Sequence, residues 1–283
     1  MPKARKRKTP VTEASNLSVS AAAKPRSSRT VIRRFHVLTK EQARLQTLPP
    51  SSETLSRLSE LQAEMDQLGG LEKYQQMSVI GQGTDRGGGS EKIFIQWLRE
   101  EGLATCHGAV IKRLSLLEVG ALKSENYKSC SSWIDVTPID LHPRHSGILE
   151  QDFLMLHPEE NEAKWDLISL SLVINFVPVP TDRGRMLVLS HKFLVNGGYL
   201  FLALPLPCVM NSRYVTPEYL LNLMEVLGFV QVKTRCKQGG KMAYWLFRKK
   251  LHSDSSAVTG NFDFRRKTVL RQGDRNNFAV LLP

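Results

Sequence analysis

The sequence predicts an α/β protein whose sheet is mostly parallel and ends in an antiparallel hairpin. Three observations predict this fold. From about residue 112 onwards the chain holds seven short apolar runs, two of the intervals between them carry helical signals, and the polar segment "RCKQGGKM" joins the last two runs. Apolar runs that alternate with helices are typical of parallel strands covered on both faces. The last two runs fit a hairpin around Gly239 and Gly240.

The elements of this region follow from apolar runs and from capping residues. A helix is expected between the fourth and fifth strands, with Thr181 as its N-cap and Gly197-Gly198 as its end. Another is expected between the fifth and sixth strands, capped by Thr216 with Pro217 at the first helical position. Between the first two strands there is barely room for a helix. The expected strands are Ser115–Val119, Trp133–Asp135 with a continuation to Leu141, Gly147–Glu150, Leu167–Leu172, Tyr199–Leu204, Phe229–Thr234 and Ala243–Arg248.

Two amphipathic helices are expected before the sheet, as a helical N-terminal extension over residues 35–111. The first covers residues 53–68 and stops at Gly69-Gly70. The second follows Ser90, which we expect as its N-cap, and includes Trp97, which we expect in the core. The segment "GQGTDRGGGS" between them is too rich in glycine for regular structure. The apolar positions of the two helices are Leu55, Leu58, Leu61, Met65 and Leu68, then Ile93, Phe94, Trp97 and Leu98.

The net charge of +12 lies mainly at the N-terminus, where residues 1–34 hold ten Lys or Arg against Glu13. These residues lack hydrophobic periodicity, so we expect a disordered basic arm. Its interpretation is nuclear targeting with non-specific attraction to nucleic acid; the alternative is a solvated charged terminus. A basic C-terminal segment is expected over residues 251–283, and the runs "RKK" at 248–250 and "RRK" at 265–267 add to the attraction. With 41% hydrophobic residues, the chain as a whole is not disordered.

The cysteines and the hydropathy pattern exclude several classes of protein. Cys106, Cys130, Cys208 and Cys236 form no C-x-x-C pair and have no His at ligand spacing, so no metal site is expected. The chain has no apolar segment of the length that a signal peptide or a membrane span needs. We therefore expect an intracellular protein with reduced cysteines, acting as a monomer.

The stretch "LSLLEVGALKSENY" indicates the kind of cofactor. It places Glu118 and Gly120 at the end of the first strand, where ligands of open parallel sheets bind. The dinucleotide fingerprint G-x-G-x-x-G is incomplete, which disfavours an NAD-dependent oxidoreductase. S-adenosylmethionine carries no phosphate and needs one close backbone approach together with carboxylates. Gly120 could provide the approach and Glu118 could orient the methionine end, although Gly120 could also be an ordinary turn glycine.

The next two strand ends supply further acids. Asp140 lies twenty residues beyond Gly120 in "IDVTPIDLHP", where a carboxylate can accept hydrogen bonds from both ribose hydroxyls. Asp152 and Phe153 follow the third strand, where the acid could bind the adenine amino group and the ring could lie against the adenine. Structural roles remain the alternative for Asp140 and Asp152. Three successive strand ends therefore favour S-adenosylmethionine as the cofactor.

Four segments carry a family resemblance: "EVG", "DLHPRHSGILEQDF", "WDLISLSLVINFVP" and "GGYLFLALPLPCVMNSRY". They resemble the fungal nucleolar methyltransferases that modify N1 of an adenine in large-subunit (25S) ribosomal RNA. The resemblance extends from about "GGLEKYQ", at Gly69-Gly70, to about Arg248. It implies a Rossmann-like methyltransferase fold, S-adenosylmethionine, ribosomal RNA or a pre-ribosome as partner, a nucleolar location, and cofactor contacts at Gly120 and Asp140. The sequence departs from the general methyltransferase pattern in having one glycine where three are common.

This resemblance directs attention to the loop after the fourth strand, "SLSLVINFVP", where this fold usually meets the target base. Adenine N1 has its own lone pair, so positioning suffices and no covalent nucleophile is required. Ser171 and Asn175 could hydrogen-bond the adenine edge, and Phe176 could stack on a base removed from its helix. The alternative for Ser171 and Phe176 is simple packing.

Two functions remain open from the sequence. The first is an rRNA methyltransferase, and the second is a protein that senses S-adenosylmethionine and acts through a protein partner. The basic arm favours the first, because an rRNA enzyme gains both an address and electrostatic affinity from it.

Overall fold

The structure is a computed structural model that describes all residues except 1–27, 71, 74–88, 105–112, 238 and 252–261. Most of the expected basic arm, most of "GQGTDRGGGS" and Cys106 lie outside the described residues. The arm is shorter than expected, because helix α1, Ser28–Gln46, begins within residues 1–34. Within the described part, no helix is long and apolar enough to cross a membrane.

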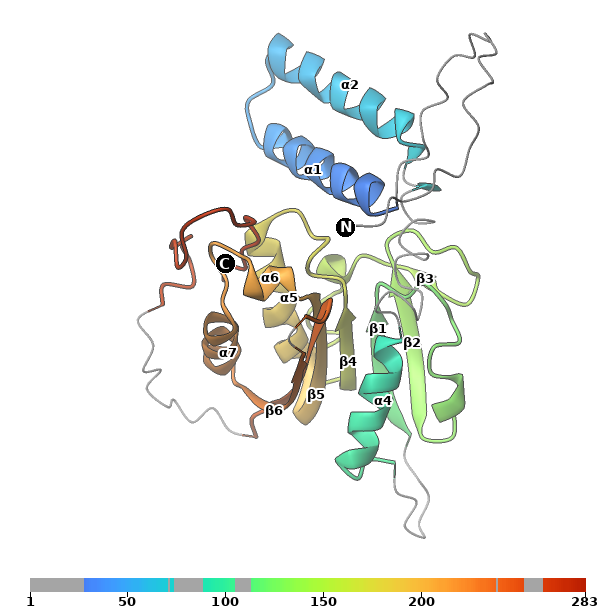
Figure 1. The fold of residues 1–283 in the computed structure, drawn as a ribbon. Coiled ribbons are helices and arrows are strands. Elements are labelled where there is room, and N and C mark those ends of the chain that lie inside the picture. Colours follow the sequence, from blue (N-terminus) through green and yellow to red (C-terminus); the bar gives the residue numbers. More distant parts are fainter. Residues whose placement is uncertain (1–27, 71, 74–88, 105–112, 238, 252–261) are drawn as a thin grey trace, which may run out of the picture.

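A seven-stranded sheet with the order β3-β2-β1-β4-β5-β7-β6 forms the centre of the molecule (Figure 1). All neighbouring pairs are parallel except β5 with β7 and β6 with β7, which are antiparallel. The predicted parallel sheet with a closing hairpin is therefore confirmed. The strands are β1 Leu114–Val119, β2 Ile134–Asp140, β3 Leu149–Glu150, β4 Trp165–Ser171, β5 Leu194–Pro205, β6 Phe229–Cys236 and β7 Met242–Lys249.

One of the two helices expected between the strands has different ends. Helix α5 is Pro180–Phe193, and its N-cap is Val179 rather than Thr181, because Pro180 already occupies the first turn. It does not continue to Gly197-Gly198, since Leu194 passes directly into β5. Helix α7, Pro217–Val226, is capped as expected, with the Thr216 hydroxyl accepting from the Tyr219 amide at 3.1 Å. The remaining short helices are η2 Lys128–Cys130, η3 Phe153–Met155 and α6 Pro207–Met210.

The sheet is covered on both faces, with a separate apolar cluster on each. Neighbouring residues of β1 point to opposite faces, so Leu116 packs with helix α4 while Leu117 packs with α5 and α7. Helix α4, Ser90–Glu100, brings Trp97 into the first cluster, as expected. Its N-cap is Gly89 and not Ser90. Helix α4 is therefore part of the sheet domain, although the sequence placed it in the N-terminal extension.

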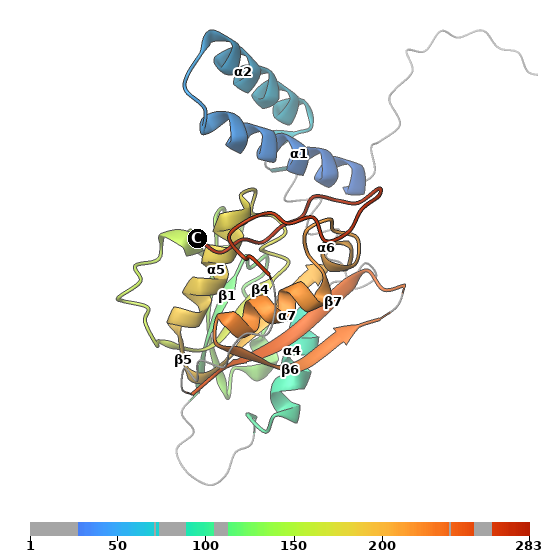
Figure 2. The same cartoon turned by 90° about the vertical axis from the view of Figure 1, so that its left-hand side faces the viewer.

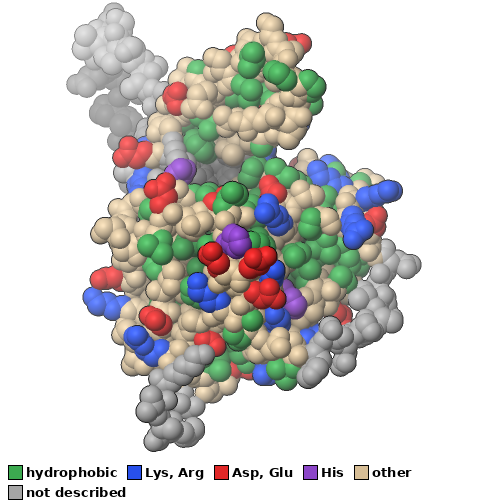
Figure 3. Space-filling view, turned by 180° about the vertical axis from the view of Figure 1, so that it is seen from behind, with side chains coloured by type: hydrophobic (Ala, Val, Ile, Leu, Met, Phe, Trp, Pro, Cys, Tyr) green, Lys and Arg blue, Asp and Glu red, His purple; other side chains and the backbone are tan. Residues whose placement is uncertain are grey.

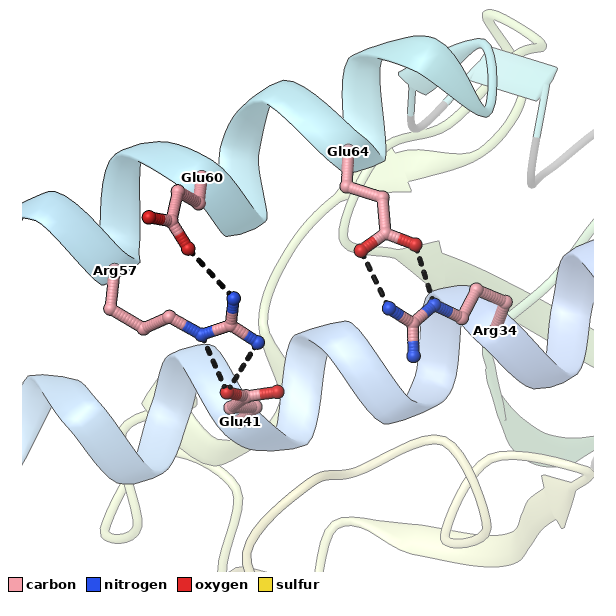
Figure 4. Close-up of polar contacts among 5 residues, drawn as sticks. All are labelled: Arg34, Glu41, Arg57, Glu60 and Glu64. Atoms are coloured by element: carbon pink, nitrogen blue, oxygen red, sulfur yellow. Dashed lines mark hydrogen bonds and ion pairs between the residues drawn. The ribbon is translucent and has the colours of Figure 1, made fainter.

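Helices α1 and α2, Ser52–Gln67, form a hairpin that lies above the body of the molecule in two views (Figures 1 and 2). Ion pairs join the two helices: Arg34 of α1 donates to both oxygens of Glu64 at 2.6 Å, and Arg57 of α2 pairs with Glu41 (Figure 4). Arg57 also pairs with Glu60 within α2. Such exposed pairs contribute little stability. The hairpin is held mainly by an apolar cluster of Phe35, Leu38, Leu45, Leu61, Met65 and Leu68.

The C-terminal segment 262–283 packs on the sheet domain instead of being only a basic tail. The guanidinium of Arg183, 1% exposed, donates to the carbonyls of Val177, Pro178 and Ala279 at 2.7, 3.1 and 2.6 Å. Gly184 lies so close to Leu281 that a Cβ on it would be 1.8 Å from the Leu281 carbonyl oxygen. The segment is thus fastened to the start of α5 and to the loop between β4 and α5.

Candidate functional site

The topology places the expected site residues at one edge of the sheet. Strand order reverses between β1 and β4, which are neighbours, and ligands of open parallel sheets bind at the carboxyl ends of the strands at such a point. The ends of β1, β2 and β4 carry Glu118 with Gly120, Asp140, and Ser171. Asp152 and Asn175 follow β3 and β4. Residues that are far apart in the sequence are therefore brought to the same edge.

Glu118 is a buried carboxylate with one unused oxygen. Its side chain is 7% exposed, and its Oε1 accepts a hydrogen bond from Asn126 Nδ2 at 2.6 Å, while its Oε2 has no partner. Burial raises the pKa of Glu118 to about 7; the hydrogen bond from Asn126 opposes this rise and the charge of Glu91 adds to it. Such a carboxylate would be stabilised by a bound cation. Sequence reasoning missed Asn126, because an asparagine in a polar loop gives no signal of its own.

Gly120 forms the turn directly after β1. Its φ is +73°, and its amide donates to the Ile139 carbonyl at 2.8 Å. A Cβ at this position would lie 2.9 Å from Val173 Cγ2. Both the backbone conformation and the lack of space therefore require glycine. The structure shows that Gly120 is a turn glycine, and its role in close approach by a cofactor stays a prediction.

Asp140 ends β2 and is half-buried. Its Oδ1 accepts a hydrogen bond from the His142 amide at 2.8 Å, which fixes the carboxylate against the loop that follows. Burial raises the pKa of Asp140, and the interactions with His142 oppose the rise. A half-buried carboxylate with this orientation can accept hydrogen bonds from hydroxyl groups of a ligand.

Asp152 and Phe153, which follow β3, both have structural roles in the folded protein. Asp152 caps the short helix η3, because its Oδ1 accepts from the Leu154 amide at 2.8 Å. Phe153 is buried in the core, where its ring packs edge-on against Phe193 with centroids 5.6 Å apart. The structure therefore does not support the expected contact between Phe153 and an adenine ring.

The loop between β4 and α5 contains the expected base-contacting residues. Ser171 Oγ donates to Ser90 Oγ at 2.7 Å, which joins β4 to the start of α4, so Ser171 has a structural partner. Leu172 takes a positive φ of 59°, and its amide bonds to the Ala203 carbonyl at 2.9 Å. Asn175 differs from Ser171, because its Oδ1 is buried and has no hydrogen-bond partner. Phe176 is half-buried.

Two unpaired acceptors define the site. Among the described residues, Glu118 Oε2 and Asn175 Oδ1 are the only buried side-chain oxygen or nitrogen atoms without a hydrogen-bond partner. Leaving such an atom unpaired costs about 1 to 3 kcal/mol, so native proteins rarely do so without a reason. Both atoms are acceptors; Glu118 lies near the end of β1 and Asn175 in the loop after β4, and these two strands flank the reversal point. The site is therefore suited to a ligand that brings a cationic donor and a second donor. The described residues hold no group of three His, Cys, Asp or Glu that could bind a metal ion.

The chain matches one family model and two curated relatives over most of its length. Residues 59–280 match the family model described as 25S rRNA (adenine(2142)-N(1))-methyltransferase, Bmt2. The chain is 34% identical to the 25S rRNA (adenine(2142)-N(1))-methyltransferase of Saccharomyces cerevisiae over 88% of this chain and 71% of the relative. It is also 34% identical to the 25S rRNA adenine-N(1) methyltransferase of Schizosaccharomyces pombe over 88% of this chain and 89% of the relative. Among solved structures, a 1,6-didemethyltoxoflavin-N1-methyltransferase of Burkholderia thailandensis aligns with a TM-score of 0.42 and 16% identity, over 57% of this chain and 76% of that one.

Proposed function

We propose an activity that rests on two facts. The first is that the chain belongs to the family of 25S rRNA (adenine(2142)-N(1))-methyltransferases, Bmt2. The second, which carries the proposal on the structural side, is the pair of unpaired acceptors on Glu118 and Asn175 at the reversal point of the sheet. The protein transfers a methyl group from S-adenosylmethionine to N1 of an adenine in large-subunit ribosomal RNA.

The strand ends fit the parts of the cofactor. When bound, S-adenosylmethionine supplies a methyl group on a positively charged sulfur. The Glu118 carboxylate would accept from the ammonium of its methionine end, since Oε2 is buried and has no other donor. Gly120 allows the backbone to approach closely, and the Asp140 carboxylate would accept from the ribose hydroxyls. Asp152 uses Oδ1 to accept a hydrogen bond from the Leu154 amide of η3, and its carboxylate remains a candidate acceptor for the adenine amino group.

The target adenine would be held by the loop after β4. The Asn175 Oδ1 would accept a hydrogen bond from the N6 amino group, which lies next to N1 on the Watson–Crick edge. Held in this way, the N1 lone pair would be free to accept the methyl group that the cofactor supplies. No proton has to leave N1, and the product base carries the positive charge. The chain therefore needs to position the base and to exclude water, but it needs no general base.

Asp140→Asn tests the cofactor assignment. The amide keeps the Oδ1 acceptor for the His142 amide but removes the charge that strengthens hydrogen bonds to the ribose. Affinity for S-adenosylmethionine should fall by about 1.5 to 2 kcal/mol, or about 10- to 30-fold, as measured by calorimetry. Asp135→Asn, an exposed change on the same strand, is the matched control and should have no effect. A lower melting temperature with unchanged affinity would show that Asp140 is only structural.

The activity itself is tested by disrupting the gene and measuring N1-methyladenosine in rRNA nucleosides by mass spectrometry. The wild-type chain should restore the modified nucleoside, and Gly120→Arg should not, because a side chain at this position would collide with Val173 and displace the end of β1. An unchanged level after disruption would remove the assignment and favour a sensor of S-adenosylmethionine that acts through a protein partner.

The location and the form of the substrate belong to the same proposal. A nucleolar enzyme that acts as a monomer, on rRNA or on a pre-ribosome, accords with the basic residues that precede α1. Deleting residues 1–27 should abolish nucleolar accumulation of a fluorescent fusion while leaving affinity for S-adenosylmethionine intact. Nucleolar signal without these residues would refute their role as an address.

A further inference from the structure

We propose that a basic rim binds the rRNA phosphates next to the target adenine, and that this rim consists of Lys40 on α1, Arg213 after α6, and Arg265, Arg266 and Lys267 in the C-terminal segment. This inference rests on the proposed function and names the surface that holds the rest of the substrate. Three parts of the chain that are distant in sequence contribute to the rim. The "RRK" run alone gave no indication that they would meet.

Neighbouring carboxylates neutralise little of the positive charge of the rim. Some cations elsewhere, namely Arg34, Arg57 and Lys233, form ion pairs with carboxylates. No described carboxylate lies within salt-bridge distance of Lys40, Arg213, Arg265 or Lys267. The Arg266 side chain is 86% exposed, and its one carboxylate, that of Asp263, lies at 3.9 Å. Unpaired positive charge on a fixed surface attracts anions, above all a polyanion such as RNA.

The charges also lie close enough to act on one another. Burial lowers the pKa of Lys40, and the nearby cations Arg183 and Lys267 lower it further. Lys267 Nζ in turn lies 5.9 Å from the centre of the Tyr214 ring. Arg213 is held by Asn277 Oδ1 at 2.8 Å, which places it against the C-terminal segment. A phosphate that entered here would meet charges from α1, from the loop after α6 and from the C-terminal segment.

The C-terminal part of the rim is fixed to the body by Arg271. Its guanidinium reaches into the loop after α6, and the Leu270 amide donates to the Arg213 carbonyl at 2.9 Å. Arg265, Arg266 and Lys267, which lie four to six positions before Arg271, therefore cannot move far from this surface. The backbone carbonyls that accept from the guanidinium are those of Val209, Met210, Ser212 and Val215, at 2.5 to 3.0 Å.

The rim adjoins the loop that would hold the adenine. Arg183 joins Val177 and Pro178 of that loop to Ala279, and its guanidinium lies 4.7 Å from the centre of the Phe278 ring. Asn175 is two residues before this connection. Figure 3 shows Lys and Arg side chains gathered at the edge of the body below the hairpin, on the side of the C-terminal segment. Phosphates that flank an inserted base would pass this edge.

Charge reversal tests the rim in the full chain. The double variant Arg266→Glu with Lys267→Glu should bind an rRNA fragment at least about 10-fold more weakly at moderate salt, and the salt slope of binding should fall by about 2. Its affinity for S-adenosylmethionine should equal that of the wild type, because neither side chain lies at a strand end. The KM for the RNA in methyl transfer should rise in parallel.

The matched control is Arg113→Glu with Lys164→Glu, which changes the charge by the same amount at the amino ends of β1 and β4, the opposite edge of the sheet. It should leave the salt slope unchanged. The proposed role of the rim would be overturned if both double variants lost RNA affinity equally, or if Arg266→Glu with Lys267→Glu bound RNA as tightly as the wild type. If the wild type itself transfers no methyl group to rRNA, the proposed function fails instead, so the two failures are distinguishable.

Discussion

Glu118→Gln is expected to stabilise the free protein above pH 7 while removing most of its affinity for S-adenosylmethionine. The folded protein holds Glu118 at a pKa of about 7, above the ordinary value of 4.5, because burial disfavours the charge. Between these two pH values the folded state keeps a proton that the unfolded state releases. Stability is therefore lost as the pH rises from 4.5 through 7, and the loss is complete above 7.

The size of this effect follows from the interval between the two pKa values. Each pH unit is worth about 1.4 kcal/mol, so the ionised carboxylate costs the free protein about 3 kcal/mol at pH 8. The glutamine side chain of the variant would keep an oxygen for the Asn126 amide without the buried charge. Thermal unfolding should show the variant to be more stable than the wild type at pH 8, with the difference vanishing near pH 4.5. Glu125→Gln, an exposed change nearby, should leave the stability unchanged at both pH values.

Glu118→Gln should weaken the binding of S-adenosylmethionine, although it stabilises the free protein. Removing one partner of a buried ion pair costs about 3 to 5 kcal/mol, so the glutamine variant should bind at least about 100-fold more weakly. Near pH 7 the wild type should release a proton on binding, because the cation favours the ionised form. Calorimetry in two buffers with different ionisation enthalpies measures that proton. Wild-type affinity in the variant, or binding without proton release, would mean that Glu118 does not contact the ammonium.

The sheet and its binding edge could be predicted because their signals are local. The run that ends in Glu118 and Gly120 and the run that ends in Asp140 are visible as buried strands followed by polar residues, and the structure places them side by side. The prediction did not extend to single atoms. Which acceptor is left without a partner depends on neighbours such as Asn126, and those neighbours are set by the folded loop.

The errors have physical causes of the same kind. Helix α1 was missed because basic residues near Ser28 suggested disorder, whereas Phe35 and Leu38 are buried by the cluster shared with α2. The C-terminal segment was described only as basic, from runs such as "RRK" at 265–267, because no sequence pattern records the bonds from the Arg271 guanidinium to backbone carbonyls. Phe153 was assigned to the ligand because it follows an acid at a strand end, but its ring fills the core.

Asn175→Leu is expected to lower kcat for rRNA methylation by about 100-fold, with unchanged affinity for S-adenosylmethionine. The leucine is similar in size and lacks the acceptor, so the buried N6 amino group of the target would have no partner, at a cost of about 3 kcal/mol at the upper end of the usual range. Asn175 Oδ1 bonds to nothing in the free protein, so the melting temperature should not fall. Ser171→Ala, which loses only the bond to Ser90, is the control and should retain most of the activity.

A modified substrate separates recognition of the amino group from any other role of Asn175. An RNA fragment with purine riboside at the target position keeps N1 but lacks the N6 amino group. The wild type should methylate it about as poorly as Asn175→Leu methylates adenine. The variant should lose little more on the modified RNA, because the two changes remove the two halves of one hydrogen bond and their effects do not add. Fully additive losses would show that Asn175 acts elsewhere, and would leave the adenine amino group to another acceptor.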